Sequence, residues 1–223
     1  MMKKAVFSWS TGKDSALALY KILESKEYEI VSLVTTVTEE YGRVSMHGLR
    51  EELLEMQAES IGIPLKKIFI PKNCTNEVYE KSFNSGLREF IANDIKTIIF
   101  GDIFLEDVRD YRIKHMEKIG VSCIFPIWQE KSTELAERFI GLGFRAKTVC
   151  IDSEVLTKQF AGREYDLEFI SQLPANIDKC GENGEFHTFT YDGPIFNFPV
   201  NCTPGEIVLR DSRFYYCDIY KTE

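Results

Sequence analysis

The chain has 223 residues, of which 44% are hydrophobic, and a formal charge of −8 with histidine neutral. This length and composition allow a substantial core, in one large domain or in a main domain with a smaller one. The acidic balance argues against a large nucleic-acid footprint, because phosphate neutralisation needs clustered lysine and arginine. No apolar run approaches the roughly 20 residues of a membrane span, so we expect neither a membrane protein nor a secreted one.

The six cysteines lie far apart in the sequence, and no two have the CxxC spacing of zinc ribbons or redox dithiols. We therefore expect reduced thiols in a cytoplasmic protein, most of them small buried apolar residues. Cys180, beside Gly181, is the one that lies next to other candidate functional residues.

Short β-branched runs alternate with helical patterns along the first two thirds of the chain. We predict strands over residues 4–7, 30–36, 66–70, 97–100, 123–125 and 146–151. Apolar residues at helical spacing predict helices over residues 16–23, 49–56 and 83–91. This order is typical of an α/β fold in which helices cover a parallel sheet.

The pattern changes after about residue 152, where Gly, Pro and Asn become frequent. We predict one helix over residues 165–173, strands over 207–209 and 214–220, and a turn at Pro204 and Gly205. This segment is typical of a smaller α+β part.

The most informative motif follows the first predicted strand and reads Ser10-Thr11-Gly12-Lys13-Asp14-Ser15. Its single glycine excludes both the GxGxxG dinucleotide fingerprint and the GxxxxGK[ST] Walker loop. Small hydroxyls, a glycine and a lysine at a helix start are typical of phosphate binding. The alternative is a Ser/Gly/Asp turn that only caps the helix.

This motif resembles the pyrophosphate loop of the N-type ATP pyrophosphatases, which cleave ATP between its α and β phosphates. The resemblance implies that Ser10, Thr11, Gly12 and Ser15 bind the phosphates and that Lys13 offsets their charge. It also implies that Asp14 holds Mg²⁺ or fixes the loop. Stabilisation of the departing anion would lower the barrier.

A second motif, residues 180–189, places two glycines, two carboxylates and a histidine within ten residues. Glycines let the backbone approach a ligand, and Glu182 and Glu185 could bind an ammonium ion, a quaternary amine or Mg²⁺. The alternative is a polar turn that leads into a strand.

Together the two motifs resemble the diphthine–ammonia ligase family, whose members pair an S-G-G-K-D-S loop with a later E-G-G-E-F-E-T segment. The resemblance implies a Rossmann-like ATP-binding domain over residues 1–145 and an acceptor domain over residues 146–223. It implies that ATP adenylates a carboxylate and that ammonia displaces AMP, with catalytic roles for Lys13, Asp14, Glu182 and Glu185. The implied acceptor is diphthine on elongation factor 2, or a related carboxylate in a bacterium.

Three residues depart from the family motifs. Thr11 stands where glycine is frequent, and its branched side chain disfavours positive φ, so we expect ordinary backbone geometry there. Asn183 also replaces a glycine, and asparagine tolerates the left-handed region. His187 replaces a glutamate, which removes a negative charge that would attract a trimethylammonium group.

Further candidates lie beside the predicted nucleotide site. His47 precedes a helix start, Thr35 ends the second strand, and Gly101 follows the fourth, at a strand end where open α/β sheets bind ligands. In the charged run 106–112, Arg109 or Arg112 could contact phosphate; the alternative is a solvated helix start.

Two other functions stay open at this point. One is a regulatory module that binds ATP or AMP without turnover, and the other is a tRNA-modifying ATP pyrophosphatase, which the acidic charge and the cysteine spacing oppose. The sequence leaves open the acceptor, the ammonia source and whether the chain forms a homo-oligomer.

Overall fold

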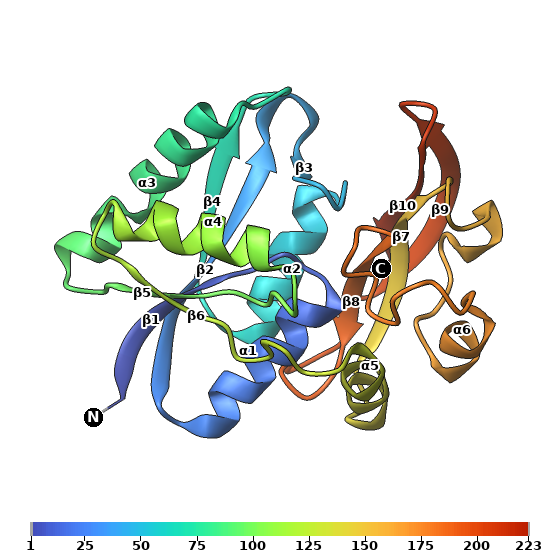
Figure 1. Ribbon diagram of the computed structural model, residues 1–223, viewed down its shortest axis with the longest axis horizontal. Helices are drawn as coiled ribbons and strands as arrows, with labels where there is room; N and C mark the ends of the chain where they lie inside the picture. Colours follow the sequence, from blue (N-terminus) through green and yellow to red (C-terminus); the bar gives the residue numbers. More distant parts are fainter. Residues whose placement is uncertain (1, 223) are drawn as a thin grey trace.

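The computed structural model describes residues 2–222 and contains two β-sheets that lie side by side (Figure 1). The first sheet has the order β3-β2-β1-β5-β6, with β4 also paired to β2. Its strands are β1 (Lys3–Ser8), β2 (Tyr28–Thr38), β3 (Arg43–Val44), β4 (Leu65–Ile70), β5 (Thr97–Ile99) and β6 (Ser122–Ile124). All pairings are parallel except that of the two-residue strand β3 with β2.

Helices cover both faces of the parallel sheet, because its strands carry apolar residues on both sides. In β1, Ala5 and Phe7 pack in one core cluster with residues of the first two helices, whereas Val6 packs in a second cluster with residues of the next two. These helices are α1 (Lys13–Ser25), α2 (Glu51–Ile61), α3 (Asn76–Ala92) and α4 (Glu106–Glu117), with a short 3-10 helix η1 (Glu39–Tyr41) after β2.

The second sheet is antiparallel, with the order β8-β7-β10-β9. Its elements are α5 (Ser132–Gly141), β7 (Arg145–Asp152), η2 (Lys158–Phe160), α6 (Leu167–Gln172), β8 (Phe186–Asp192), β9 (Cys202–Arg210) and β10 (Phe214–Lys221). Buried residues of this sheet, such as Ile151 and Phe186, belong to the same core cluster as Leu19 of α1 and Leu53 of α2. The two parts therefore share one continuous core.

The predicted α/β fold and the predicted strands are confirmed, and a helix lies at each position where one was predicted, whereas α4 and α5 were not predicted from apolar spacing. All six cysteines are free, as expected. No helix among residues 2–222 is long and apolar enough to cross a membrane. The second sheet begins at β7, but the division into residues 1–145 and 146–223 stays a prediction.

The predicted turn at Pro204 and Gly205 is wrong, because both residues lie inside β9. Proline is tolerated there because β9 is an edge strand. A side chain at position 205 would collide with the ring of Tyr220 on the paired strand β10. Glycine at this position therefore reflects a close approach between strands.

An ion-pair cluster joins β10 to the first sheet and α2. The Asp218 carboxylate accepts hydrogen bonds from Arg43 at 3.0 and 3.1 Å and from Arg50 at 2.6 and 3.1 Å. Burial alone would raise the pKa of Asp218, but the two guanidinium groups hold it well below its ordinary value.

We expect Asp218→Asn to lower the free energy of unfolding by about 2 kcal/mol at pH 7, because two partly buried arginines lose their counterion. A carboxyl group with a depressed folded-state pKa stabilises the fold above its unfolded pKa of about 4, and this contribution is lost as the pH falls through the lower folded value. The difference between the two proteins should therefore shrink below about pH 4. Urea unfolding at several pH values measures it, with Glu206→Gln on exposed β9 as the control; an equal effect of both substitutions would contradict the prediction.

Candidate functional site

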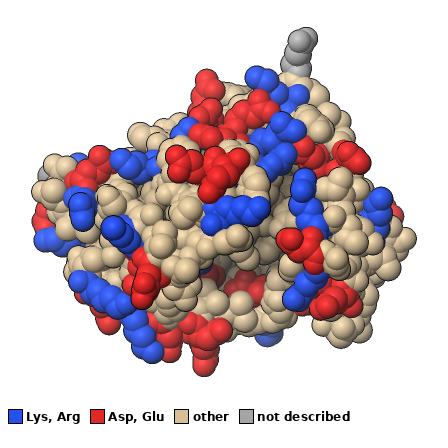
Figure 2. Space-filling view, turned by 90° about the horizontal axis from the view of Figure 1, so that it is seen from above, with Lys and Arg blue, Asp and Glu red and all other residues tan. Residues whose placement is uncertain are grey.

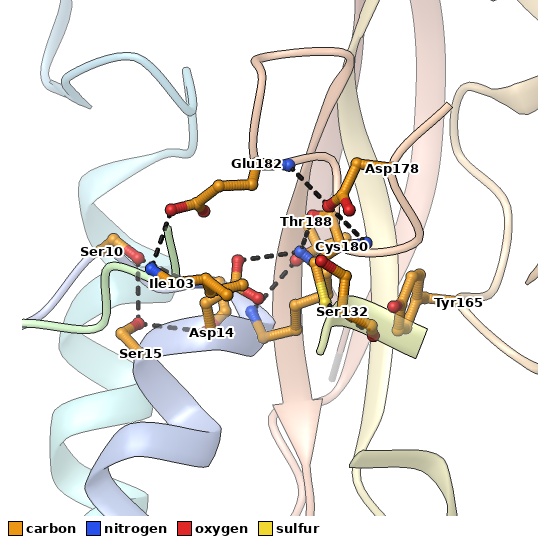
Figure 3. Close-up of polar contacts among 12 residues, drawn as sticks. Ser10, Asp14, Ser15, Ile103, Ser132, Tyr165, Asp178, Cys180, Glu182 and Thr188 are labelled. Carbon is orange, nitrogen blue, oxygen red and sulfur yellow. Dashed lines mark hydrogen bonds and ion pairs between the residues drawn. The ribbon is translucent and has the colours of Figure 1, made fainter. Parts of the chain in front are cut away.

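The hydroxyl-rich loop lies at the carboxyl end of β1 and runs directly into α1, whose N-cap is Gly12. The Ser10 and Ser15 hydroxyls lie 2.9 Å apart, and the Ser15 hydroxyl donates to the Gly12 carbonyl at 3.1 Å (Figure 3). No side chain caps the helix at Gly12, and the Thr188 hydroxyl accepts the Lys13 N–H, so within residues 2–222 the N–H groups of Asp14 and Ser15 are left without a side-chain acceptor. The local arrangement suits an anion.

Thr11 departs from the ordinary geometry predicted for it, because its φ is 75°. A β-branched residue in the left-handed region costs on the order of 1–2 kcal/mol, so the surroundings must enforce it. The Thr11 carbonyl accepts hydrogen bonds from the Thr190 amide at 2.9 Å and from the Gln57 side chain at 3.0 Å. These two bonds, one from β8 and one from α2, hold the strained peptide in place.

In the second motif, the left-handed positions belong to Gly181 (φ 69°) and Gly184 (φ 88°), which flank Asn183. Asn183 itself does not adopt positive φ, so the tolerance of asparagine for the left-handed region is not what fits it to this loop. Its side-chain amide instead donates to the Glu185 carboxylate at 2.9 Å.

The Lys13 ammonium points away from the loop and into the C-terminal part. It pairs with the Asp14 carboxylate at 2.8 Å, donates to the Cys180 carbonyl, and lies 5.2 Å from the ring centre of Phe186. The Lys13 backbone N–H donates to the Thr188 hydroxyl at 3.1 Å, and the whole residue is only 3% exposed. The loop is thus closed over by β8 and by the segment before it.

Burial and charge oppose each other in the Lys13–Asp14 pair. Burial is the largest single influence and disfavours the Lys13 cation, but the acidic neighbours, Asp14 first and then Cys180 and Glu182, together raise the pKa of Lys13. Burial also raises the pKa of Asp14, and Lys13 offsets only part of that rise. The Asp14 side chain is 28% exposed, so this carboxylate stays accessible to solvent.

Glu182 connects the two parts of the molecule. Its carboxylate accepts the Ile103 amide at 2.8 Å and the Phe104 amide at 3.4 Å, and Figure 3 shows it pointing from its own loop toward Ile103. Burial, together with the nearby Asp14, raises the pKa of Glu182 to about 7. This carboxyl group can therefore gain or lose a proton near neutral pH.

The structure places Glu185 in a different setting from Glu182. Its carboxylate accepts the Asp178 amide at 3.1 Å and the Asn183 amide at 3.0 Å, besides the Asn183 side chain. Glu185 thus braces the loop that carries Glu182. A direct catalytic role for Glu185 stays a prediction.

Two histidines from different parts of the chain stack beside the loop. The rings of His47 and His187 are 4.8 Å apart and inclined by 24°, and His47 Nδ1 lies 3.3 Å from the Thr11 hydroxyl. Burial, with the charge of Lys13 nearby, lowers the pKa of His187 to about 4. Burial, His187 and Lys13 also hold the pKa of His47 well below its ordinary value. Both rings are therefore neutral at pH 7.

The structure places Thr35 and Gly101 against the backbone that supports the loop, and neither has a side chain exposed beside it. The Thr35 hydroxyl is buried and donates to the Trp9 carbonyl at 2.8 Å. A side chain at position 101 would meet the Ser15 backbone at 3.0 Å, so the chain after β5 lies directly against the start of α1. Their proposed nucleotide contacts stay predictions.

Sequence reasoning missed Gln57, Thr188 and Thr190. Gln57 is fully buried, accepts the Trp9 indole N–H at 2.9 Å and donates to both the Thr11 and the Thr190 carbonyl oxygens. A signal for Gln57 was present, since it stands among the apolar residues of α2. Thr188 also had a signal, since it lies in the second motif at the final threonine of the family pattern, whereas Thr190 gave none, because alternating threonines are ordinary in a strand.

Comparison with known proteins identifies the family of the chain. A sequence profile for the diphthamide synthase N-terminal domain matches residues 2–123, and one for the diphthamide synthase C-terminal domain matches residues 131–223. The chain belongs to the diphthamide synthase family.

Relatives include the diphthine–ammonia ligases of Schizosaccharomyces pombe, 24% identical, and of Homo sapiens, 20% identical. Each match covers 91% of this chain. The chain spans 36% of the length of the S. pombe protein and 84% of that of the human one. A third relative, the diphthine–ammonia ligase of Saccharomyces cerevisiae, is 21% identical and is matched over 35% of its length.

Membership in the diphthamide synthase family implies ATP, and the loop fits a triphosphate because its hydroxyls and uncapped helix start are the required donors. Among residues 2–222 no three metal-ligating side chains gather at one point. Magnesium usually binds one or two carboxylates together with substrate phosphates, so Asp14 alone is a fitting donor.

We expect Gly101→Ala to lower the free energy of unfolding by about 1–3 kcal/mol, because the new methyl group would meet the backbone of Ser15 and Asp14. Gly141→Ala is the matched control, since nothing lies within 4 Å of its added carbon, and we expect a change within about 0.5 kcal/mol. Thermal and urea unfolding measure both. Equal stability of the two variants would contradict the close packing of Gly101 on α1.

Glu182 should make stability depend on pH. Its folded-state pKa, raised from 4.5 to about 7, means that stability from the protonated form is present at low pH and is lost as the pH rises through about 7. Glu182→Gln mimics the neutral form, so from pH 5 to pH 8 the wild-type protein should lose about 1–3 kcal/mol relative to the variant. Urea unfolding across this range measures the difference, with Glu24→Gln on the exposed face of α1 as control; parallel curves would refute the raised pKa.

Proposed function

We propose that the protein is an ATP-dependent ligase that adenylates a carboxylate and amidates it with ammonia, releasing AMP and pyrophosphate. The observation that carries the proposal is the closure of the Ser10–Ser15 loop by the second sheet of a diphthamide synthase chain. A phosphate loop that contacts a second sheet with titratable groups suits a reaction between two substrates better than nucleotide sensing without turnover.

Each part of the site has a role in this reaction. The hydroxyls of Ser10 and Ser15, with the backbone at Thr11 and Gly12, bind the phosphates that leave as pyrophosphate. Asp14 holds Mg²⁺ jointly with phosphate oxygens, and Lys13 fixes the Asp14 carboxylate in position at 2.8 Å. Thr35 and Gly101 hold the loop and the start of α1 in position. His47 packs against the loop beside Thr11.

ATP supplies the adenylyl group that converts the oxide of a carboxylate into a good leaving group. Glu182, with a pKa of about 7, binds the incoming ammonium ion and takes a proton from it, and the ammonia so formed attacks the acyl adenylate. AMP leaves as the amide forms, and the amide nitrogen releases its extra proton to water. Glu185 keeps the Glu182 loop in place through its hydrogen bonds to Asp178 and Asn183.

The names of the relatives point to diphthine as the acceptor, and the family resemblance of the two motifs implies that elongation factor 2 carries it. One observation favours a second candidate, a carboxylate without a fixed cation. His187 is neutral and stacks on His47, so it offers no negative charge to a trimethylammonium group. The alternatives of a nucleotide sensor and of a tRNA-modifying pyrophosphatase gain no comparable support from the site.

The product of ATP tests the proposal. We expect the protein with Mg²⁺, ATP and ammonium to form AMP and pyrophosphate, and more of both when diphthine-modified elongation factor 2 is the acceptor. Asp14→Asn keeps the side-chain volume and should reduce pyrophosphate release by about 100-fold or more, because the metal-binding charge is lost. Glu24→Gln is the control.

Chromatography of the nucleotides and an enzymatic pyrophosphate assay measure these products. Formation of ADP and phosphate would contradict the proposed cleavage site. Nucleotide binding without any turnover, with every acceptor, would favour the sensor.

A further inference from the structure

Arg109 on α4 has a setting unlike that of the other arginines at the same edge of the parallel sheet. Its guanidinium carbon lies 4.8 Å from the ring centre of Trp128 and 5.8 Å from that of Phe125. Its Nε atom is buried and has no hydrogen-bond partner within residues 2–222. A buried donor of this kind calls for a ligand or a bound water.

Four other buried or partly buried cations already form ion pairs with carboxylates. Arg112 Nε lies 2.8 Å from Asp102, Lys13 pairs with Asp14, and Arg43 and Arg50 share Asp218. Across the part of the chain that the structure describes, Arg109 makes no ion pair within 4 Å. Arg109 is therefore a cation on α4 that has no carboxylate partner among residues 2–222.

Arg109 lies on α4, and the segment just before α4 contacts both the phosphate loop and Glu182. Helix α4 begins a few residues after Gly101, which packs on Ser15, and Ile103, which binds Glu182. The Trp128 loop joins the same segment, since the Gln129 amide donates to the Ile103 carbonyl at 2.6 Å. Figure 1 shows α4 starting at the side of the first sheet that faces the second.

The molecule is hollowed between its two parts on the face that Figure 2 shows, with acidic side chains visible in the depth and basic ones on the rim. An acidic hollow repels the carboxylate and phosphate groups that the proposed reaction must bring together. The reaction therefore needs, near the reacting atoms, a cation that is not already neutralised by a protein carboxylate.

We propose that Arg109 binds an oxyanion of a reactant, either the α-phosphate of the nucleotide or the carboxylate of the acceptor. The inference rests on the proposed function and adds a specificity residue to it. With one face of the guanidinium on Trp128, the planar edge remains for a bidentate pair, which both oxyanions accept. A lysine could not present this fork.

Binding measurements on the full chain test Arg109 without any turnover. The probes are AMP and adenosine, titrated by calorimetry, and ¹³C-labelled acetate, followed by NMR line width. Arg109→Gln should weaken one oxyanion by about 10-fold or more, as loss of a charge-assisted bidentate pair implies. Adenosine, which has no oxyanion, should bind unchanged. Arg88→Gln, on the exposed side of α3, is the control.

Weaker AMP binding with unchanged adenosine binding would assign Arg109 to the nucleotide phosphate. Unchanged AMP binding with weaker acetate binding would assign it to the acceptor carboxylate. Unchanged binding of both AMP and acetate to a folded Arg109→Gln protein would overturn the inference.

Loss of the Trp128 contact could unfold Arg109→Gln, and Arg109→Lys then decides. Lysine keeps the charge but not the fork, so it should retain only part of the affinity, and full affinity would refute the bidentate pair. A wild-type protein that binds neither ATP nor AMP would contradict the proposed function instead, and the acetate titration would still test Arg109.

Discussion

The enclosure of the Lys13 ammonium is the interaction on which the rest of the site depends. A buried cation is costly unless it is paired and hydrogen-bonded, and Lys13 obtains its partners from both parts of the chain: Asp14 from its own helix and the Cys180 carbonyl from the second motif. Separation of the phosphate loop from the second sheet would therefore remove the Cys180 carbonyl and the Phe186 ring from Lys13. These polar contacts lie beside the core cluster that the two sheets share.

Because Lys13 is committed in this way, the negative charge of a triphosphate has to be met by other groups. Backbone N–H groups at the start of α1 and the hydroxyls of Ser10 and Ser15 remain, along with the Asp14 carboxylate, which in our proposal holds a metal ion. In that proposal Lys13 holds the Asp14 carboxylate instead of contacting phosphate. The family motif predicts Lys13 as part of the site, but only its contact with Cys180, 167 residues away in the sequence, shows which way the side chain points.

Features set by nearby residues were predictable, and features set by distant ones were not. The strands at β1 and β5 and the loop after β1 follow from apolar runs and from small residues at a helix start. The positive φ of Thr11 contradicts its local preference, since Gln57 and Thr190 impose it from other elements. Likewise, the run from Cys180 to Phe189 gave two similar carboxylates, and only packing separates Glu182, which reaches Ile103, from Glu185, which turns back on its own loop.

The backbone strain at Thr11 and the protonation of Glu182 both depend on the position of β8. The Thr190 amide that fixes the Thr11 carbonyl lies on β8, and the loop that enters β8 carries Glu182 to the Ile103 amide. Any movement of β8 thus changes the geometry of the phosphate loop and the burial of Glu182 together. Since burial is the largest cause of the raised pKa of Glu182, opening the cleft lowers that pKa and ionises the group, whereas closure favours its protonated form. The packing of one strand therefore couples the backbone of the proposed phosphate loop to the protonation of Glu182.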